Sequence, residues 1–344
     1  MKGEAPAPPY YTLHSTLFTS FDMLRYLAQR LLESVPLLFL ITVAVFVVLQ
    51  ILPAGPLSVY ENDPALSAED LRRLEERFGL HEPIPVRYFR WLGAIMQGDL
   101  GYSLVTQQPV ITMISDRLLN TLYLMSVALL VTLLIALPIG IISAVRQYSW
   151  LDHLSTTFSF VGFSVPPFWS GLMLIILFSV KFREWGLPSL PASGMTTLGG
   201  DGGLPDRLAH LILPVTVLAL FNAAQYSRFV RSSMLEVIRQ DYIRTARAKG
   251  LSDRIVLWGH ALKNASLPVV TMITLDLPGL FSGAVVTESI FAWPGMGRLF
   301  LDSAFRFDYA VLMGVVTISA ALVIASNLLA DLLYAWLDPR IRLS

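Results

Sequence analysis

The chain alternates between long, nearly charge-free apolar segments and polar segments that carry most of its Lys, Arg, Asp and Glu residues. A helix needs about 20 mostly apolar residues to cross a hydrocarbon core of ~30 Å. Six segments predict membrane-spanning helices: 37–52, 118–145, 154–180, 211–227, 267–291 and 309–330. The fourth is short but continues helically through "RFVRSSMLEVI", and the sixth continues through Tyr334. The pattern predicts an all-α polytopic membrane protein with six transmembrane helices.

Positive charge gathers before the first predicted span, after the second, between the fourth and fifth, and after the sixth. Under the six-span count these segments share one side, and Lys and Arg in short loops mark the cytoplasmic side of a membrane. The opposite loops, 181–207 and 298–308, have balanced charges. Both termini are therefore expected in the cytoplasm of a bacterial or archaeal cell, with the protein in the inner or plasma membrane.

This orientation divides the chain into five parts. They are a cytoplasmic tail (1–24), the first transmembrane helix (25–52), an external helical region (53–117), a five-helix core (118–337) with a cytoplasmic segment at 232–263, and a cytoplasmic tail (338–344). The first twenty residues lack the unbroken apolar core of a signal peptide, so we expect no cleavage.

Two helices are predicted in the external region. "SAEDLRRLEERFGL" places Ser67 as the N-cap, acidic residues in the first turn and Gly79 near the end. "PVRYFRWLGAIM" follows, with Tyr88 and Trp91 suited to the lipid headgroups, and "GDLGYS" turns the chain back. The pattern alone favours an external cap without chemistry.

The composition agrees with a membrane protein and excludes several other classes. Of 344 residues, 54 % are hydrophobic and 15 % charged, against roughly 25 % charged in soluble domains. A formal net charge of zero argues against a nucleic-acid-binding protein. The lack of Cys excludes disulfides and thiolate metal sites, and five scattered His without HExxH argue against a zinc enzyme. Without a GxxxxGK[ST] loop, any ATP chemistry belongs to a partner.

Two acidic residues, Asp276 and Glu288, lie within the fifth predicted span. An ionised side chain that faces lipid costs ~2.5–3.5 kcal/mol, so both need a polar environment. One interpretation has them line a translocation pathway or fix its gate, together with Pro278, Gly283 and Thr287. The other has them buried against Arg or backbone donors, or has Glu288 reach the outer interface.

Gly and Pro residues in the spans have ordinary structural explanations. Gly279 and Gly283 lie four positions apart and predict close helix packing. Pro278 predicts a kink in the fifth span, and Pro166-Pro167 predicts a bend in the third.

Three further polar residues belong to the spans. Asn222 and Gln225 in the fourth span either face the pore or hydrogen-bond to another helix. Asp331, near the inner end of the sixth, is expected to pair with a cytoplasmic Arg rather than touch cargo.

The stretch 241–263, "DYIRTARAKGLSDRIVLWGHALK", is polar, basic and too long for a simple turn. In a helix, Tyr242, Ala246 and Gly250 form one narrow stripe, and Gly250 suits the position after a helix end, where φ is positive. Ser252 predicts the cap of a second short helix. Two short helices at an angle then form a protruding knob. A purely structural interpretation stays open, because positive charge on the cytoplasmic side plus a helical turn explains the same residues.

Aligned on Gly250, this stretch resembles the cytoplasmic signature of binding-protein-dependent ABC importer permeases. That signature reads Glu-Ala-Ala, three residues, Gly, nine residues, an aliphatic residue, one residue and Leu-Pro. The corresponding residues are Arg244, Thr245, Ala246, Gly250, His260, Leu262 and Lys263. Arg, Thr, His and Lys depart from the signature, in the manner of its peptide and nickel importer branch.

Other motifs resemble the same branch in the same order, so that the resemblance covers most of 25–343. They are "VRYFRWLGAIMQGDLGYSL", "RLLNTLYL", "GFSVPPFW", "PASG", "HLILPVTVLAL", "RFVRSSMLEVI", "ESIFAWPGMGRL" and "DYAVLMGVV".

The resemblance implies a type I ABC importer permease fold that forms half of a translocation pathway and works by alternating access. It also implies that the basic stretch is the coupling helix, which docks into a groove of a cytoplasmic ATPase. The implied coupling residues are Tyr242, Arg244, Thr245, Ala246, Arg247, Gly250, Leu251, His260 and Leu262.

The implied partners are a second, homologous permease in a heterodimer, two cytoplasmic ABC ATPase subunits, an external substrate-binding protein and membrane lipid. ATP and Mg would be bound by the ATPases, and no cofactor, metal or catalytic residue is expected in this chain. Di- or oligopeptides are the expected cargo, and nickel and oligosaccharides stay open. An ion-coupled secondary transporter would show inverted repeats, and an intramembrane enzyme would show a nucleophile or metal set; neither pattern is found.

Overall fold

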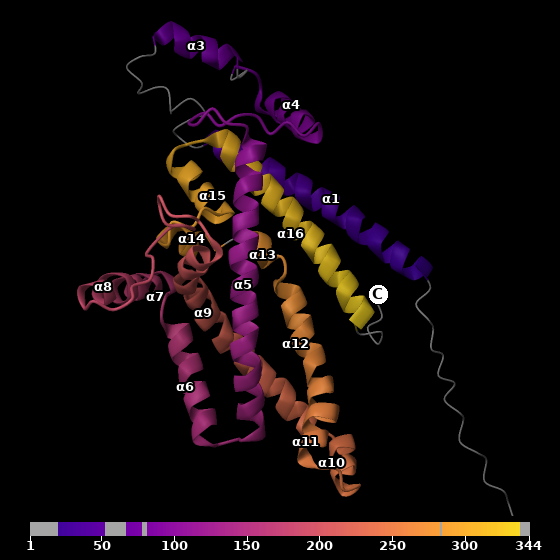
Figure 1. The fold of residues 1–344 in the computed structure, drawn as a ribbon. Coiled ribbons are helices and arrows are strands. Elements are labelled where there is room, and N and C mark those ends of the chain that lie inside the picture. The colour runs from indigo at the N-terminus through magenta and orange to yellow at the C-terminus, as the bar shows by residue number, and fades with distance from the viewer. Residues whose placement is uncertain (1–19, 52–66, 78–80, 283, 338–344) are drawn as a thin grey trace, which may run out of the picture.

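The computed structural model describes residues 20–51, 67–77, 81–282 and 284–337, and the regular structure of these ranges is helical (Figure 1). The helices are α1 (Ser20–Ile51), α3 (Ala68–Arg77), α4 (Ile84–Met96), α5 (Val110–Val145), α6 (Trp150–Ser164), α7 (Pro167–Leu174), η1 (Ile175–Lys181), α8 (Phe182–Glu184), α9 (Leu204–Ile238), α10 (Asp241–Ala248), α11 (Asp253–Ile255), η2 (Val256–Ala261), α12 (Leu262–Asp276), α13 (Gly279–Ser282), α14 (Val285–Ile290), α15 (Met296–Phe305) and α16 (Tyr309–Leu337). An isolated antiparallel bridge joins Tyr102 and Pro109.

Five described helical runs are long and apolar enough to cross a membrane: 28–51, 110–145, 204–238, 253–281 and 309–333. A sixth span results when the helix pair 150–162 and 167–184, which is bent by 101°, is counted as one. The all-α prediction is confirmed, and the six-span count agrees with the structure when the bent pair is one span. The C-terminal tail predicted at 338–344 and most of the N-terminal tail lie outside the described residues.

The centre of the bundle is the pair α5 and α9, which pack against each other along much of their length. A stripe of small buried side chains on α5, formed by Ala136, Gly140 and Ala144, lets the two helices approach closely. At Gly140 the backbone of Ser227 on α9 leaves no room for a side chain. Helices α6 and α12 also pack on α9, and α1 packs on α16 (Figure 1).

The third predicted span is sharply bent rather than straight. Helix α6 ends at Ser164, Val165 and Pro166 are extended, and α7 begins at Pro167. A residue before proline is driven out of the α region, so two consecutive prolines extend both Val165 and Pro166. Pro167 then begins the next helix at a position where its missing N–H is harmless. The predicted bend is confirmed, and its size turns the chain almost at a right angle.

The fifth predicted span, 267–291, is wrong at both ends. Helices α11, η2 and α12 form one run that begins at Asp253, so the predicted second short helix is instead the start of this span. Pro278 has no N–H to continue the α-helical pattern. The neighbouring bonds from Leu280 N to Leu277 O and from Phe281 N to Pro278 O are of the tighter i to i+3 type. The last part of the predicted span belongs to a separate helix, α14 (Val285–Ile290).

The predicted close packing of the two glycines fails at Gly279. A Cβ there would meet no atom within 4 Å, and Gly283 lies outside the described residues.

The two predicted external helices are present, at the end of the bundle opposite α10 and α11 (Figure 1). Helix α3 begins directly after Ser67, and Gly79 lies outside the described residues. Helix α4 packs on α1. Tyr88 is buried there, with its hydroxyl 2.8 Å from Thr42 Oγ1 and its ring edge-on to Phe46. Tyr88 therefore contacts protein, in contrast to its predicted position at the headgroups.

The turn after α4 is tied to the start of α16. Ser103 Oγ donates a hydrogen bond to Asp308 Oδ2, and the backbone N of Leu104 donates to Oδ1 at 3.2 Å. Ser103 and Asp308 are both buried. The described part of the segment predicted to be external is therefore attached to the helix bundle at α1 and at α16.

Candidate functional site

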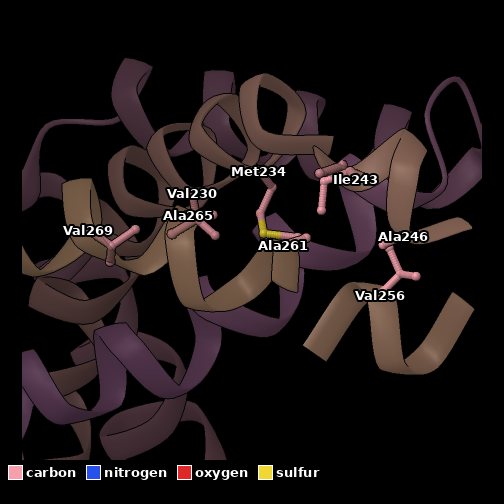
Figure 2. Close-up of a cluster of buried hydrophobic side chains, with 9 residues drawn as sticks. Val230, Met234, Ile243, Ala246, Val256, Ala261, Ala265 and Val269 are labelled. Carbon is pink, nitrogen blue, oxygen red and sulfur yellow. The ribbon is translucent and has the colours of Figure 1, made fainter. Parts of the chain in front are cut away.

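Helix α10 is fixed to the bundle by an apolar core. Ile243 is fully buried and Ala246 nearly so, and both belong to a cluster with Met234 of α9 and with Val256 and Ala261 of η2 (Figure 2). The same cluster continues along α9 and α12. Helix α10 is therefore packed as part of the bundle, and a displacement of α10 must move α9 and α12.

The turn after α10 has the predicted glycine geometry. Gly250 has a φ of +80°, which confirms the positive φ predicted for this position. Its N–H donates to Arg247 O at 2.9 Å, and the N–H of Leu251 donates to Ala246 O at 3.4 Å. Ser252 is the N-cap residue of α11 as predicted, but its side chain makes no capping hydrogen bond.

Gly250→Leu is expected to loosen α10. The space around Gly250 is open within the chain, so the effect comes from φ, because a side chain at positive φ costs ~1–2 kcal/mol. Hydrogen exchange of the α10 amides should become about tenfold faster. Gly259→Ala is the matched control, since Gly259 is equally open and its φ is not positive. Equal exchange in the two variants would contradict the role of φ.

The exposed side of α10, α11 and η2 combines apolar and basic side chains. Trp258 is 62 % exposed and Ile255 53 % exposed. Arg247 lies 3.3 Å from Asp253, but exposed ion pairs of this kind contribute little, so the guanidinium remains available to a partner. We call the following exposed residues the coupling surface: Tyr242, Arg244, Arg247, Leu251, Ile255 and Trp258.

The remaining predicted coupling residues have contacts inside the chain. Thr245 Oγ1 donates to the Asp241 carbonyl, and Leu262 packs against the buried cluster. His260 is half-buried, and its carbonyl accepts a hydrogen bond from Asn264 Nδ2 at 3.0 Å. The same Asn264 amide donates to the Tyr242 hydroxyl at 3.1 Å and so ties α10 to α12. Asn264 could not be identified from the sequence, because a single Asn after the signature belongs to no recognisable spacing pattern.

The predicted pathway residues separate into two groups. Asp276 is exposed at the end of α12, and Tyr226 of α9 donates its hydroxyl to Asp276 Oδ2 at 2.5 Å. Pro278 lies beside it in the interruption of the span. In the same stretch of α9, Asn222 is half-buried and Gln225 is exposed. The part of the chain that the structure describes holds no group of three or more His, Asp or Glu residues able to bind a metal ion.

Glu288 has a closed environment on the separate helix α14. It is fully buried, and so is its neighbour Thr287. Thr121 Oγ1 of α5 donates to Glu288 Oε1 at 2.8 Å, and the backbone N of Arg298 donates to Oε2 at 3.0 Å. Thr121 Oγ1 in turn accepts from the backbone N of Met296 at 2.7 Å. This arrangement corresponds to the structural interpretation of a buried carboxylate, with one backbone donor and one hydroxyl donor.

The corner between α14 and α15 closes around Glu288. A Cβ at Gly295 would collide with the Glu288 carboxyl group. Trp293 Nε1 donates to the Asn120 carbonyl at 3.0 Å, and Asn120 Nδ2 donates to the Pro294 carbonyl at 2.9 Å. Asn120 and Thr121 on α5 could not be identified from the sequence, because their hydrogen-bond partners are more than 160 residues away along the chain.

Two ion pairs tie helices together. Arg231 of α9 contacts both oxygens of Asp152 on α6, at 2.8 and 2.9 Å, and the backbone N of Tyr148 donates to the same carboxylate at 3.0 Å. In the sequence, Arg231 counts only as positive charge. Arg30 lies 3.4 Å from Asp331, which confirms the predicted pairing of Asp331 with an Arg.

Family models match most of the chain. "Binding-protein-dependent transport system inner membrane component" matches residues 136–343, and the N-terminal model of the same system matches residues 23–125. The chain is 46 % identical over 320 residues to the oligopeptide transport system permease protein AppB of Bacillus subtilis, covering 93 % of this chain and 99 % of that protein. It is 38 % identical over 339 residues to the dipeptide transport system permease protein DppB of Escherichia coli, covering 93 % and 99 %.

A solved structure shares the fold. The crystal structure of an amino acid ABC transporter with histidines aligns with a TM-score of 0.50 at 14 % identity, over 66 % of this chain and 94 % of that chain. This likeness shows the fold alone, and it agrees with the importer permease architecture predicted for the membrane core. The protein is thus a multi-pass membrane transport component rather than an enzyme, and it belongs to the family of binding-protein-dependent transport system inner membrane components.

Proposed function

We propose that this chain is the permease subunit of an ATP-driven importer and forms half of a pathway for peptides delivered by an external binding protein. The cargo is inferred from relatives named as oligopeptide and dipeptide permeases that align over 93 % of the chain. Partner ATPases would supply the energy, and a second, homologous permease would form the other half of the pathway.

The packing of α10 is the observation that carries the coupling role. A helix that transmits the movement of a separate ATPase must be rigidly attached to the pathway helices. Ile243 and Ala246 provide this attachment, because they are buried in one cluster with side chains of α9, η2 and α12. A push on α10 would therefore reach α12, which ends at Asp276, next to the interruption of the span.

The coupling surface has the chemistry of a docking site. Trp, Tyr and Arg dominate the binding energy of protein interfaces, and this surface holds Trp258, Tyr242 and two exposed Arg residues. An apolar groove with acidic edges on the ATPase would complement it. In this proposal the coupling surface and both termini lie in the cytoplasm, and 53–117 lies outside.

The pathway would be lined at the interruption of the fifth span. Asp276 and Pro278 lie at this break, and Gly283 follows it in sequence. Thr287 and Glu288 would act differently. They would hold the corner between α14 and α15 against α5, and this corner would close the outer end of the pathway. The proposal thus assigns cargo contact to the first group and gate rigidity to the second.

Neighbouring cysteines on α11 and η2 test the coupling role. The chain has no Cys, so Ile255→Cys introduces a single thiol at the coupling surface. In the assembled transporter it should form a disulfide with a cysteine placed in the ATPase groove. Val256→Cys is the matched control, because Val256 is 2 % exposed and faces the buried cluster. If the Ile255→Cys transporter still takes up cargo but its thiol cross-links to none of the cysteines placed along the ATPase groove, the proposed docking site is wrong.

A further inference from the structure

Asp276 carries a negative charge that the described part of the chain does not balance. No Lys, Arg or His nitrogen of that part forms an ion pair with it, and its one hydrogen bond comes from the Tyr226 hydroxyl. A carboxylate within a membrane span is costly unless it is paired or faces an aqueous cavity. Asp276 is exposed on the described part of the chain, so a positively charged group of another molecule can reach it.

The exposed side of α12 and α13 differs from a lipid-facing surface. Helix α5 exposes Leu119, Leu130 and Leu134, each by more than half. In contrast, the positions exposed around the end of α12 include Asp276 and Gly279 beside Leu275. A charged and a small exposed residue on either side of a helix interruption are typical of protein that lines a cavity.

We propose that Asp276 binds the protonated α-amino group of the peptide in transit. The inference rests on the proposed function, since it presupposes a peptide cargo. A single carboxylate suits an ammonium group, which needs one anion and a few acceptors, whereas a metal ion needs several ligands that the described residues around Asp276 do not provide.

The α-amino group is the feature that suits a transporter of varied peptides. Its pKa in a free peptide is about 7.7–8.0, so it is mostly protonated at neutral pH. Every unmodified peptide carries it, whatever the side chains, so one carboxylate can recognise many cargoes. Conduction also requires binding weak enough for release, and a single ion pair at an exposed carboxylate is weak.

Tyr226 acts as a positioning residue. Its side chain is buried between α5 and α9, in a cluster with Ala136 and Ala223. The hydroxyl donates to Oδ2 of Asp276, which orients the carboxylate, and no group of the described residues donates a hydrogen bond to Oδ1. Tyr226→Phe should therefore weaken cargo capture and raise the apparent KM for uptake, while Asp276→Asn should lower the uptake rate itself.

Carbodiimide coupling tests the contact directly. The full transporter, with its partner permease, ATPases and a binding protein loaded with a lysine-free peptide, is arrested with ATP and vanadate. A hydrophobic carbodiimide then adds to membrane carboxyl groups and forms O-acylisoureas, and a primary amine in contact with one attacks its acyl carbon and forms an amide as the urea leaves. Mass spectrometry should find the peptide joined through its N-terminus to Asp276, and Asp276→Asn should give no adduct.

Transport assays supply the second readout. Asp276→Asn should lower peptide uptake at least about tenfold, while ATP hydrolysis stimulated by the loaded binding protein stays within about twofold. Asp276→Glu should retain uptake, because it keeps the charge. Leu275→Asn is the matched control, since it changes the exposed neighbour of Asp276 and leaves the carboxylate in place.

Two outcomes would overturn the inference. One is an intact transporter that shows no adduct at Asp276; the other is an amide between Asp276 and a lysine of the partner permease, which would make the carboxylate a structural ion-pair partner. Failure of the proposed function looks different, because the loaded binding protein would then fail to stimulate ATP hydrolysis in the wild-type complex.

Discussion

Glu288→Ala is expected to lower the free energy of unfolding by ~2–4 kcal/mol, because the buried donor Thr121 Oγ1 and the partly buried donor Arg298 N lose their acceptor at ~1–3 kcal/mol each, with the lower end for the partly buried one. The Glu288 carboxylate is fully buried, so water does not replace it. The variant should unfold at a clearly lower temperature in detergent. The fluorescence of Trp293, which lies in the same corner, reports the loss.

Two further variants separate a structural role of this corner from a pathway role. Glu288→Gln keeps one acceptor oxygen and should lose less stability than Glu288→Ala. Gly295→Ala leaves the carboxylate in place but drives a methyl group into it, so it should destabilise the corner without removing any charge. If Glu288→Ala instead unfolds at the wild-type temperature and only uptake is lost, Glu288 serves the pathway and the structural role is wrong.

Arg231→Met is expected to destabilise the protein by ~1.5–3 kcal/mol, because the Asp152 carboxylate loses the charge-assisted hydrogen bonds of its partly exposed Arg partner. The Asp152 side chain is 5 % exposed and also accepts the backbone N–H of Tyr148. The loss should open the contact of α6 with α9. Thermal unfolding and accelerated hydrogen exchange of the α6 amides measure this effect.

A double-mutant cycle identifies the pair as the cause. Arg231→Met combined with Asp152→Leu removes both charges and fills their volume, and replacement of a buried ion pair by apolar residues is often neutral. The double variant should therefore be more stable than Arg231→Met alone. If the destabilisation of the double variant equals the sum of those of Arg231→Met and Asp152→Leu alone, Asp152 and Arg231 act independently.

The helical spans could be predicted to a large extent, whereas their interruptions could not be placed fully. Length and lack of charge are local properties, so α5, α9 and α16 were recognisable from composition along the chain. The bend at Pro166-Pro167 also followed from local sterics. In the fifth span the apolar pattern continues past Pro278 although the helix does not, because hydropathy measures the environment of a segment and not its hydrogen-bond pattern.

The candidate site shows the same division. Gly250 at positive φ was predictable, since that conformation depends on the residue itself. The division of the coupling stretch into buried Ile243 and exposed Trp258 was not, because it depends on where α9 and η2 place their apolar side chains. Likewise, Asp276 and Glu288 have the same chemistry in the sequence, yet one is exposed and the other fully enclosed.

By itself, the sequence determined the class of the protein, the approximate positions of its membrane helices, the asymmetry of its charges and the position of the basic stretch 241–263. These properties follow from residue type and spacing over one or two dozen positions. Only the tertiary structure decided which carboxylates are enclosed and how α10 is attached, as in the bond between Thr121 and Glu288, which spans 167 positions. The physical reason is that the cost of a buried charge or donor depends on partners from distant segments, and the packing of the helices determines which segments meet.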